Sequence, residues 1–154
     1  MRVRDIMTKE VASCNPGTNA AAAAEIMWNR NCGALPIVED GGKVVGIITD
    51  RDLFIALGTR NQNASDVPVG EVMDGDLALC TPEDDIRGAL TTMAQRQLHR
   101  LPVVDNDGSL KGILSIDDIV LQADSNEIKD DLLNTLKAIC NGQKQLALAR
   151  RAGA

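Results

Sequence analysis

Residues 46–52 read GIITDRD, and residues 112–118 repeat the pattern as GILSIDD. In each stretch a glycine precedes two apolar residues, a hydroxyl residue follows, and an aspartate stands three positions after the hydroxyl. The sequence aligns with itself without a gap when it is shifted by 66 positions, and the matching pairs include Pro16 with Pro82. The chain is therefore written as two copies of one unit of roughly 60 residues.

Each copy predicts the element order β-α-β-β-α. Short apolar stretches before a proline indicate a first strand, and the next periodic stretch indicates a helix. In the second copy Ile86, Leu90 and Met93 are spaced to bury one face of that helix. Two β-branched runs joined by a glycine turn predict a hairpin, and a short helix follows. The expected elements lie at 11–14, 18–31, 34–49 and 50–58 in the first copy, and at 77–80, 83–97, 100–115 and 117–123 in the second.

The polar residues 59–68 indicate a linker between the copies. We therefore expect repeat 1 at 1–62, the linker and repeat 2 at 63–125, and a tail at 126–154. One copy is too small to cover both faces of its own sheet. This predicts an α+β fold in which two units pack sheet to sheet with pseudo-two-fold symmetry. Such packing would leave paired clefts between the copies, where ligands tend to bind.

The tail predicts an amphipathic C-terminal helix. Ile128, Leu132, Leu136 and Ile139 fall on one apolar face, and Asn141-Gly142 indicates the end of the helix. Such a stripe must be buried somewhere, and three partners fit it: the chain's own unit, a second copy, or a target protein.

Composition excludes several classes of function. One Trp, one Phe and no Tyr leave no aromatic platform for stacking nucleic-acid bases. The net charge of −6 opposes binding to nucleic acid and to anionic membranes. No run of the sequence predicts a membrane span or a signal peptide, so we expect a cytoplasmic protein with reduced thiols. The four cysteines form no C-x-x-C pair and His99 is the only histidine, which argues against a metal site.

Two functions fit the hydroxyl residues Thr49 and Ser115, which fall where a predicted strand gives way to a helix. The hydroxyl can cap the helix, with Asp52 or Asp118 completing a capping box. It can instead donate to a phosphate near the helix end while the aspartate accepts the two hydroxyls of a ribose. The glycine of each stretch, inside a predicted strand, indicates that something approaches the backbone closely.

With this motif, its spacing and its duplication, the chain resembles a tandem of CBS domains, often called a Bateman module. The family motif is G-h-h-[TS]-x-x-[DN], where h is apolar, and both GIITDRD and GILSIDD fit it completely. The preceding stretches GALPIV at 33–38 and HRLPVV at 99–104 also match the family pattern. The resemblance covers both copies and leaves out the tail. It implies two β-α-β-β-α units docked through their sheets.

The resemblance also implies ligand-binding roles, because CBS pairs commonly bind adenosine-containing ligands in clefts between the copies. Thr49 and Ser115 would contact phosphate, and Asp52 and Asp118 would contact ribose. The adenine would lie among the first short strand and the strand before the motif. These residues are Ser13, Cys14, Ala34, Leu35 and Pro36 in the first copy, and Leu79, Cys80, Arg100, Leu101 and Pro102 in the second.

The sequence leaves the roles of the charged residues around the two motifs open. Arg51 and Arg100 can each reach a phosphate or point to water, and Asp117 is a further candidate for ligand contact. His99 is expected to be a polar edge residue, since no nucleophile partner is visible. Trp28 is either a core residue or a contact for a partner. Cys14 and Cys80 are expected to be small core residues.

The resemblance implies a regulatory module with AMP, ADP or ATP as its ligand, and with NAD or S-adenosylmethionine as alternatives. Occupancy would be passed to a separate target protein, and the module would form a homodimer. We expect neither an obligatory cofactor nor enzymatic activity, because no phosphate loop or nucleophile–base set is visible. The alternative is a ligand-independent docking scaffold in which Thr49, Ser115 and the two aspartates only cap helices.

Overall fold

The computed structural model of the chain describes residues 1–122 and 124–153. It divides into two compact units, each centred on one repeat. The repeat-1 unit comprises Glu10–Leu77 and Val104–Leu110. The repeat-2 unit comprises Met1–Lys9, Ala78–Val103 and Lys111–Ala154. Each unit therefore contains a segment that lies far from its repeat in the sequence.

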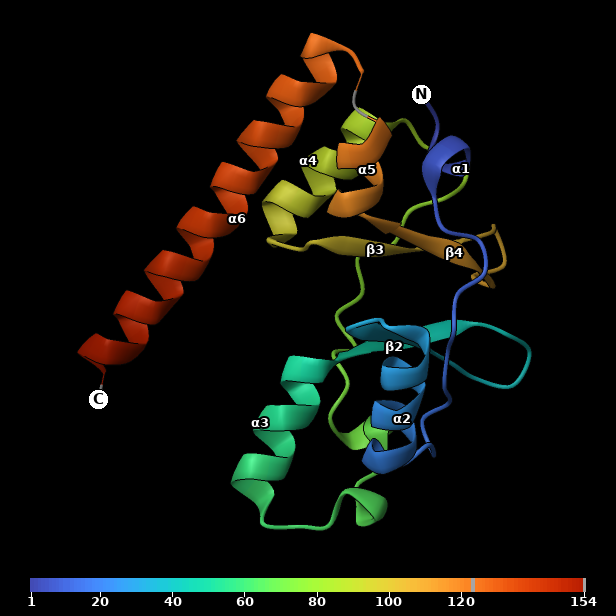
Figure 1. Cartoon of the computed structure of the whole chain (residues 1–154), viewed down its shortest axis with the longest axis vertical. Coiled ribbons are helices and arrows are strands. Elements are labelled where there is room, and N and C mark those ends of the chain that lie inside the picture. Colours follow the sequence, from blue (N-terminus) through green and yellow to red (C-terminus); the bar gives the residue numbers. More distant parts are fainter. Residues whose placement is uncertain (123, 154) are drawn as a thin grey trace. The chain divides into compact units, whose positions relative to one another are not determined.

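The repeat-1 unit is built on the antiparallel hairpin of β1 (Ala34–Val38) and β2 (Val44–Thr49). Helices α2 (Ala20–Arg30) and α3 (Asp50–Arg60) lie on the same face of this hairpin (Figure 1). Because side chains alternate along a strand, Leu35, Ile37 and Ile48 point to that face and form the core with α2 and α3. The core is aliphatic, as the composition predicts.

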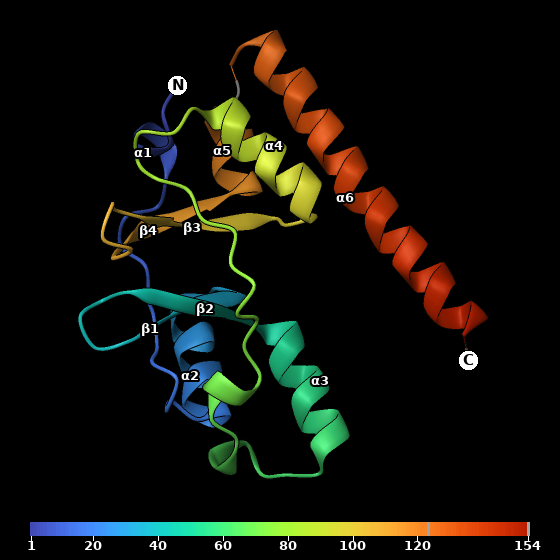
Figure 2. The ribbon, with the colours of Figure 1, turned by 180° about the vertical axis from the view of Figure 1, so that it is seen from behind.

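The repeat-2 unit has the same order of elements: α4 (Ile86–Arg96), β3 (Arg100–Val104), β4 (Leu110–Ser115) and α5 (Ile116–Gln122). Helices α4 and α5 lie on one face of the β3–β4 hairpin, and the views from the front and from behind agree (Figures 1 and 2). Ile86, Leu90 and Met93 of α4 are buried, which confirms the predicted stripe. The turn between β3 and β4 belongs with the repeat-1 unit because Ser109 pairs with Lys43.

The N-terminal segment 1–9 completes the repeat-2 unit. Its short helix α1 (Val3–Ile6) buries Val3 in the core of this unit, which stabilises the attachment by about 1.5–3 kcal/mol. Beyond α1, Thr8 forms an antiparallel bridge with Ile113 of β4. The segment therefore adds a third backbone to the edge of the hairpin.

The segment that precedes repeat 2 completes the repeat-1 unit in the same way. Here the short turn η2 (Val69–Glu71) buries Val69, and Asp74 bridges to Ile47 of β2. We call residues 1–9 and 69–77 the lead-in segments. Each repeat is thus closed by the lead-in segment that precedes the other repeat.

Gly46 and Gly112 leave no room for a side chain, because a lead-in segment passes directly over each of them. A Cβ at Gly112 would lie 2.5 Å from the carbonyl oxygen of Thr8, which is far below a normal contact. A Cβ at Gly46 would collide with the thioether of Met73. The close approach that the glycines predict is therefore made by the chain itself, whether or not a ligand is present.

The C-terminal helix is longer than the sequence predicts. Helix α6 runs from Asn126 to Ala152 and lies along α4 (Figures 1 and 2). The prediction that Asn141-Gly142 ends it is wrong, since Gly142 is buried where the side chain of Gln97 fills the space of a Cβ. This glycine serves close packing. The apolar face is confirmed: Leu132 and Ile139 are buried, and Ile128 and Leu136 pack on the same core.

Two local predictions are corrected. The strands expected at 11–14 and 77–80 reduce to single parallel bridges, Cys14 with Ile37 and Cys80 with Val103. The expected linker 59–68 is largely ordered structure: α3 continues to Arg60, η1 spans Ala64–Asp66, and Val67 is fully buried. Val67 also accepts the N–H of Ala20 through its carbonyl oxygen, so this stretch is anchored to the first turn of α2.

The α+β fold with two like repeats and a long C-terminal helix is confirmed. The boundaries 1–62, 63–125 and 126–154 and the sheet-to-sheet docking of the repeats stay predictions. Among residues 1–122 and 124–153, no helix is both long and apolar enough to cross a bilayer.

Three glycine-to-alanine variants test the lead-in contact. Gly112→Ala forces Thr8 and β4 apart and should lower the free energy of unfolding by about 1–3 kcal/mol. Gly46→Ala should cost less, because the Met73 side chain can move. Gly88→Ala meets nothing within 4 Å in the exposed interior of α4 and should raise stability by about 0.5–1 kcal/mol. Urea unfolding followed by circular dichroism measures all three, and equal effects of Gly112→Ala and Gly88→Ala would contradict the contact.

Candidate functional site

The first candidate site is the turn at which β2 ends and α3 begins. Thr49 is the N-cap of α3: its Oγ1 accepts the N–H of Asp52 at 3.1 Å. In return Asp52 Oδ2 accepts the N–H of Thr49 at 3.0 Å. Both residues are half-buried. The capping box expected from the sequence is therefore present, and it fixes both side chains at the mouth of the helix.

The second repeat has the same arrangement with additional bonds. Asp118 Oδ2 accepts the backbone N–H of Ser115 at 2.8 Å and its hydroxyl at 2.6 Å. Ser115 Oγ accepts the N–H of Asp118 at 3.1 Å. Thr8, from the lead-in segment, donates its hydroxyl to Asp118 Oδ1 at 3.2 Å. Both carboxylate oxygens of Asp118 are therefore occupied.

The two aspartates differ because the lead-in segments differ. The residue equivalent to Thr8 in the repeat-1 unit is Asp74, whose carboxylate cannot donate to Asp52. Within the described residues, Asp52 Oδ1 accepts no hydrogen bond. Asp52 therefore keeps one oxygen without a hydrogen bond for a ligand, while Asp118 already accepts three bonds and has about one acceptor position left. Sequence reasoning missed Thr8, since no motif connects two residues 110 positions apart.

Part of the expected adenine site in repeat 1 lies beside Thr49. Ala34 pairs directly with Thr49 in the hairpin, and Pro36 lies two positions further along the same face. This face is opposite the one on which α2 and α3 lie, and both Ala34 and Pro36 are buried there. Cys14 lies against β1, since its N–H donates to the carbonyl oxygen of Pro36 at 3.1 Å.

Other members of the expected set turn away from this face. The side chains of Leu35 and Cys14 lie in the core of the repeat-1 unit, and those of Leu101 and Cys80 in the core of the repeat-2 unit. The side chains of these residues therefore cannot contact a ligand, and both backbone groups of Cys14 are already bonded to β1. Ser13 is half-buried beside Cys14.

In the repeat-2 unit the expected residues are again split between core and surface. The Cys80 N–H donates to the carbonyl oxygen of Pro102 at 3.1 Å, so the two stretches lie side by side. Leu79 is exposed and Arg100, at the start of β3, is half-buried. His99 is exposed, and its carbonyl oxygen accepts the N–H of Ile116, which agrees with a polar edge position.

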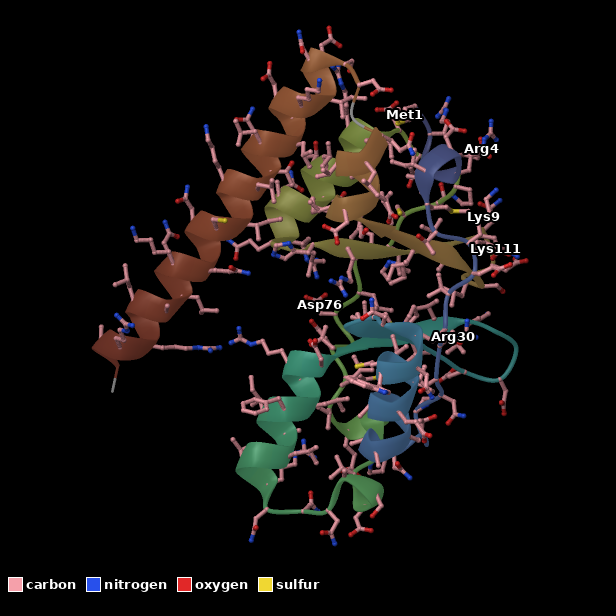
Figure 3. The ribbon with its side chains drawn as sticks, viewed as in Figure 1. Met1, Arg4, Lys9, Arg30, Asp76 and Lys111 are labelled. Carbon is pink, nitrogen blue, oxygen red and sulfur yellow. The ribbon has the colours of Figure 1, made fainter. Side chains whose placement is uncertain are left out.

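Charge near the two turns is unequal. Arg51 and Asp117 occupy equivalent positions in the motifs and are both exposed. Arg4, Lys9 and Lys111 lie on the α1 side of the repeat-2 unit (Figure 3). Arg4 is held there by an ion pair with Glu83. The lead-in segment thus brings basic side chains, as well as Thr8, to the unit that contains the second motif.

The first turn of α3 leaves little room for a phosphate at its N–H groups. The N–H of Asp50 donates to the carbonyl oxygen of Gly33 at 3.1 Å, and that of Arg51 to Asp50 Oδ1 at 2.7 Å. The N–H of Asp52 is bonded to Thr49. Because Thr49 Oγ1 only accepts in this box, its hydroxyl hydrogen remains available for donation.

Comparison with known proteins identifies the family. The CBS domain model matches residues 3–59 and 69–123. The chain therefore belongs to the CBS-domain family and carries two such domains in tandem.

Individual relatives agree with this assignment. CBS domain-containing protein YhcV of Bacillus subtilis (strain 168) is 38% identical over 134 residues, which cover 87% of this chain and 94% of YhcV. The CBS domain pair of protein MJ0100, solved in complex with 5′-methylthioadenosine and S-adenosyl-L-methionine, is 27% identical with a TM-score of 0.73. That match covers 80% of this chain and 95% of the solved CBS domain pair. Homoserine O-acetyltransferase of Methanohalophilus mahii is 29% identical across 77% of this chain, but only 24% of the enzyme is covered.

Thiol reactivity tests the burial of Cys14 and Cys80. Burial raises the pKa of Cys14 from 9.0 to about 11, and burial with the nearby Asp84 carboxylate raises the pKa of Cys80 to about 12. At pH 8 both thiols are protonated and enclosed, so iodoacetamide should modify the exposed Cys140 first. Peptide mass spectrometry measures the order of labelling.

The same shifts predict a pH dependence. The folded state holds these protons more tightly than the unfolded state, so their contribution to stability is complete below about pH 9 and declines toward pH 11–12. In the iodoacetamide experiment, labelling of Cys14 and Cys80 as fast as Cys140 in the folded protein would show that the two thiols are not enclosed. Denaturant should make all four cysteines equally reactive.

Proposed function

We propose that this protein is a regulatory module that binds an adenosine-containing ligand at the strand–helix turns of its CBS repeats. Occupancy is passed to a separate partner protein, and the module itself catalyses no reaction. AMP, ADP and ATP are the first candidates, with NAD and S-adenosylmethionine as alternatives. The protein would act in the cytoplasm, as a homodimer.

One observation carries the proposal: the unoccupied oxygen of Asp52 lies beside a hydroxyl that can still donate. Asp52 Oδ1 can accept from a ribose hydroxyl, and Thr49 can donate to a phosphate, without loss of the capping box. Ala34 and Pro36, on the face of the hairpin opposite α2 and α3, would lie against the adenine, which requires that this buried face open to the ligand. The ligands of the MJ0100 pair, which both contain adenosine, support the same ligand class.

The two repeats should not bind equally. At repeat 2, Ser115 and Thr8 already donate three hydrogen bonds to Asp118, which leaves about one acceptor position, so both ribose hydroxyls can bind only if one of these bonds is released. At repeat 1 no such exchange is needed. We therefore propose that the repeat-1 turn binds first and that Thr8 weakens the second site. The position of the ligand in clefts between the repeats, which the family resemblance implies, stays a prediction.

Regulation requires that the ligand favour one arrangement of the protein over another. The lead-in segments are suited to report occupancy, because Thr8 bonds to Asp118 and the backbone of Asp74 bridges β2 beside the first motif. A ligand that draws Asp118 away from Thr8 would loosen residues 1–9. The competing function is a ligand-independent scaffold. It is favoured by the capping boxes, which are complete without any ligand.

Alanine substitution of the two aspartates separates these functions. Asp52→Ala removes a charged acceptor, and a hydrogen bond of this kind contributes about 1.5–3 kcal/mol, so affinity should fall about 10–100-fold. Asp118→Ala should reduce affinity less, since Asp118 is already occupied. Isothermal titration with AMP, ADP, ATP, NAD and S-adenosylmethionine measures the dissociation constants, with GTP to test selectivity.

Asp130→Ala is the matched control, because it removes an exposed helical carboxylate far from either motif in the sequence. It should leave affinity unchanged, and circular dichroism verifies that each variant is folded. Unchanged affinity in Asp52→Ala, in Asp118→Ala and in the double variant would sink the site assignment. The scaffold function would then be preferred.

A further inference from the structure

The chain's only two aromatic residues are both on the surface. Trp28 on α2 and Phe54 on α3 are 85% and 79% exposed. With Met27, Leu53 and Leu57 they line a groove of about 550 Å³ between the two helices of the repeat-1 unit. Large apolar side chains gathered on one exposed face mark an interaction surface. We call this surface the α2–α3 groove.

The internal repeat shows what covers such a face. Shifted by 66 positions, Ala24 and Asn31 of the α2–α3 groove correspond to Leu90 and Gln97 of α4. Helix α6 contacts both of these residues in the repeat-2 unit, where Leu90 is buried and Gln97 remains exposed. Thr135 of α6 donates its hydroxyl to the carbonyl oxygen of Leu90 at 3.3 Å, and Gly142 lies against Gln97. An amphipathic helix with small residues at its contacts therefore fits this face of a repeat.

Helix α6 has a stretch that matches this requirement and is not used by α4. Its buried positions Leu132, Thr135, Ile139 and Gly142 follow a three–four spacing that continues at 146 and 149. Helix α4 ends at Arg96, and its C-cap Gln97 lies against Gly142 of α6. The apolar stripe of α6 therefore extends beyond the end of α4, where Leu146 is 53% exposed. Small residues lie around it, namely Ala147, Ala149 and Ala152.

Charge favours a second copy of this chain as the partner of this stretch. Lys137, Lys144, Arg150 and Arg151 follow Asp131 without any acidic residue, whereas the whole chain has 22 acidic and 16 basic residues. The end of α6 is thus basic and the rest of the molecule strongly acidic. Glu25 on α2 and Asp50 in the groove place carboxylates near Trp28 and Phe54.

We propose that residues 143–152 of α6 in one copy occupy the α2–α3 groove of a second copy, and that the contact is reciprocal. Leu146 would lie between Trp28 and Phe54, with the alanines allowing close approach. Two such contacts form a closed two-fold dimer. This inference deepens the proposed self-association and does not depend on nucleotide binding, because Thr49, Asp52, Ser115 and Asp118 take no part in the contact.

Mixing two complementary variants tests the proposal. Trp28→Glu disables the groove and Leu146→Glu disables the tail, so each variant alone should be monomeric when the wild type is dimeric. A mixture of the two should associate again, since the intact tail of the first fits the intact groove of the second. Leu133→Glu, at an equally exposed α6 position off the stripe, should remain dimeric. Sedimentation velocity on the full chains, with circular dichroism to verify folding, measures each case.

The single tryptophan gives an independent readout. Trp28 fluorescence should shift to longer wavelength on dilution of the wild type and in Leu146→Glu, because both expose the indole. A monomeric wild type at 100 µM, dimeric single variants, or a mixture that stays monomeric would each overturn the proposal. A dimeric Leu146→Glu would indicate a groove-to-groove contact, and a dimeric Trp28→Glu would indicate a tail-to-tail contact. Ligand affinity measured on the same variants should be unchanged, so failure here is distinct from failure of the nucleotide site.

Discussion

The close approach of a lead-in backbone to a strand glycine is the constraint on which both units depend. At Gly112 the carbonyl of Thr8 occupies the space that any side chain would need, and at Gly46 the side chain of Met73 does so. This contact gives each hairpin a third backbone. It also buries Val3 and Val69 in the two cores. Because each lead-in segment serves the repeat that it does not precede, neither repeat is complete on its own continuous sequence.

The same constraint determines the chemistry at the two motif turns. The lead-in segment brings Thr8 to Asp118, and the equivalent residue in the other unit is Asp74. Two nearly identical motifs therefore differ in how many carboxylate oxygens remain available. Capping and ligand binding are compatible at Thr49 and Asp52, since the box uses one oxygen of the aspartate and leaves the hydroxyl hydrogen of the threonine available. Asp118 already accepts three hydrogen bonds and has about one acceptor position left, so it could hold both hydroxyls of a ribose only by releasing one of them.

The sequence predicts much of this fold because the pattern is local and occurs twice. The hairpins, the helix α4 stripe and the capping boxes all follow from spacing within a few residues. The lead-in exchange could not be predicted, since the pairing of Thr8 with Ile113 and Asp118 spans more than a hundred positions. The prediction that Asn141-Gly142 ends the C-terminal helix was wrong because a glycine can also allow close packing inside a helix, as Gly142 does against Gln97. The prediction of a linker at 59–68 followed from its polar residues, and it missed that Val67 within this stretch is buried.

Amide hydrogen exchange with and without ligand can resolve the two motif turns and the lead-in segment in one experiment. We would add AMP, ATP and S-adenosylmethionine in turn and follow exchange peptide by peptide with mass spectrometry. We expect slower exchange at residues 46–54 at low ligand concentration, and at 112–120 only at higher concentration. Faster exchange in residues 1–9 should accompany the second event as Thr8 is released. Protection confined to other segments, or none with any of the three ligands, would show that the motif turns do not bind the ligand.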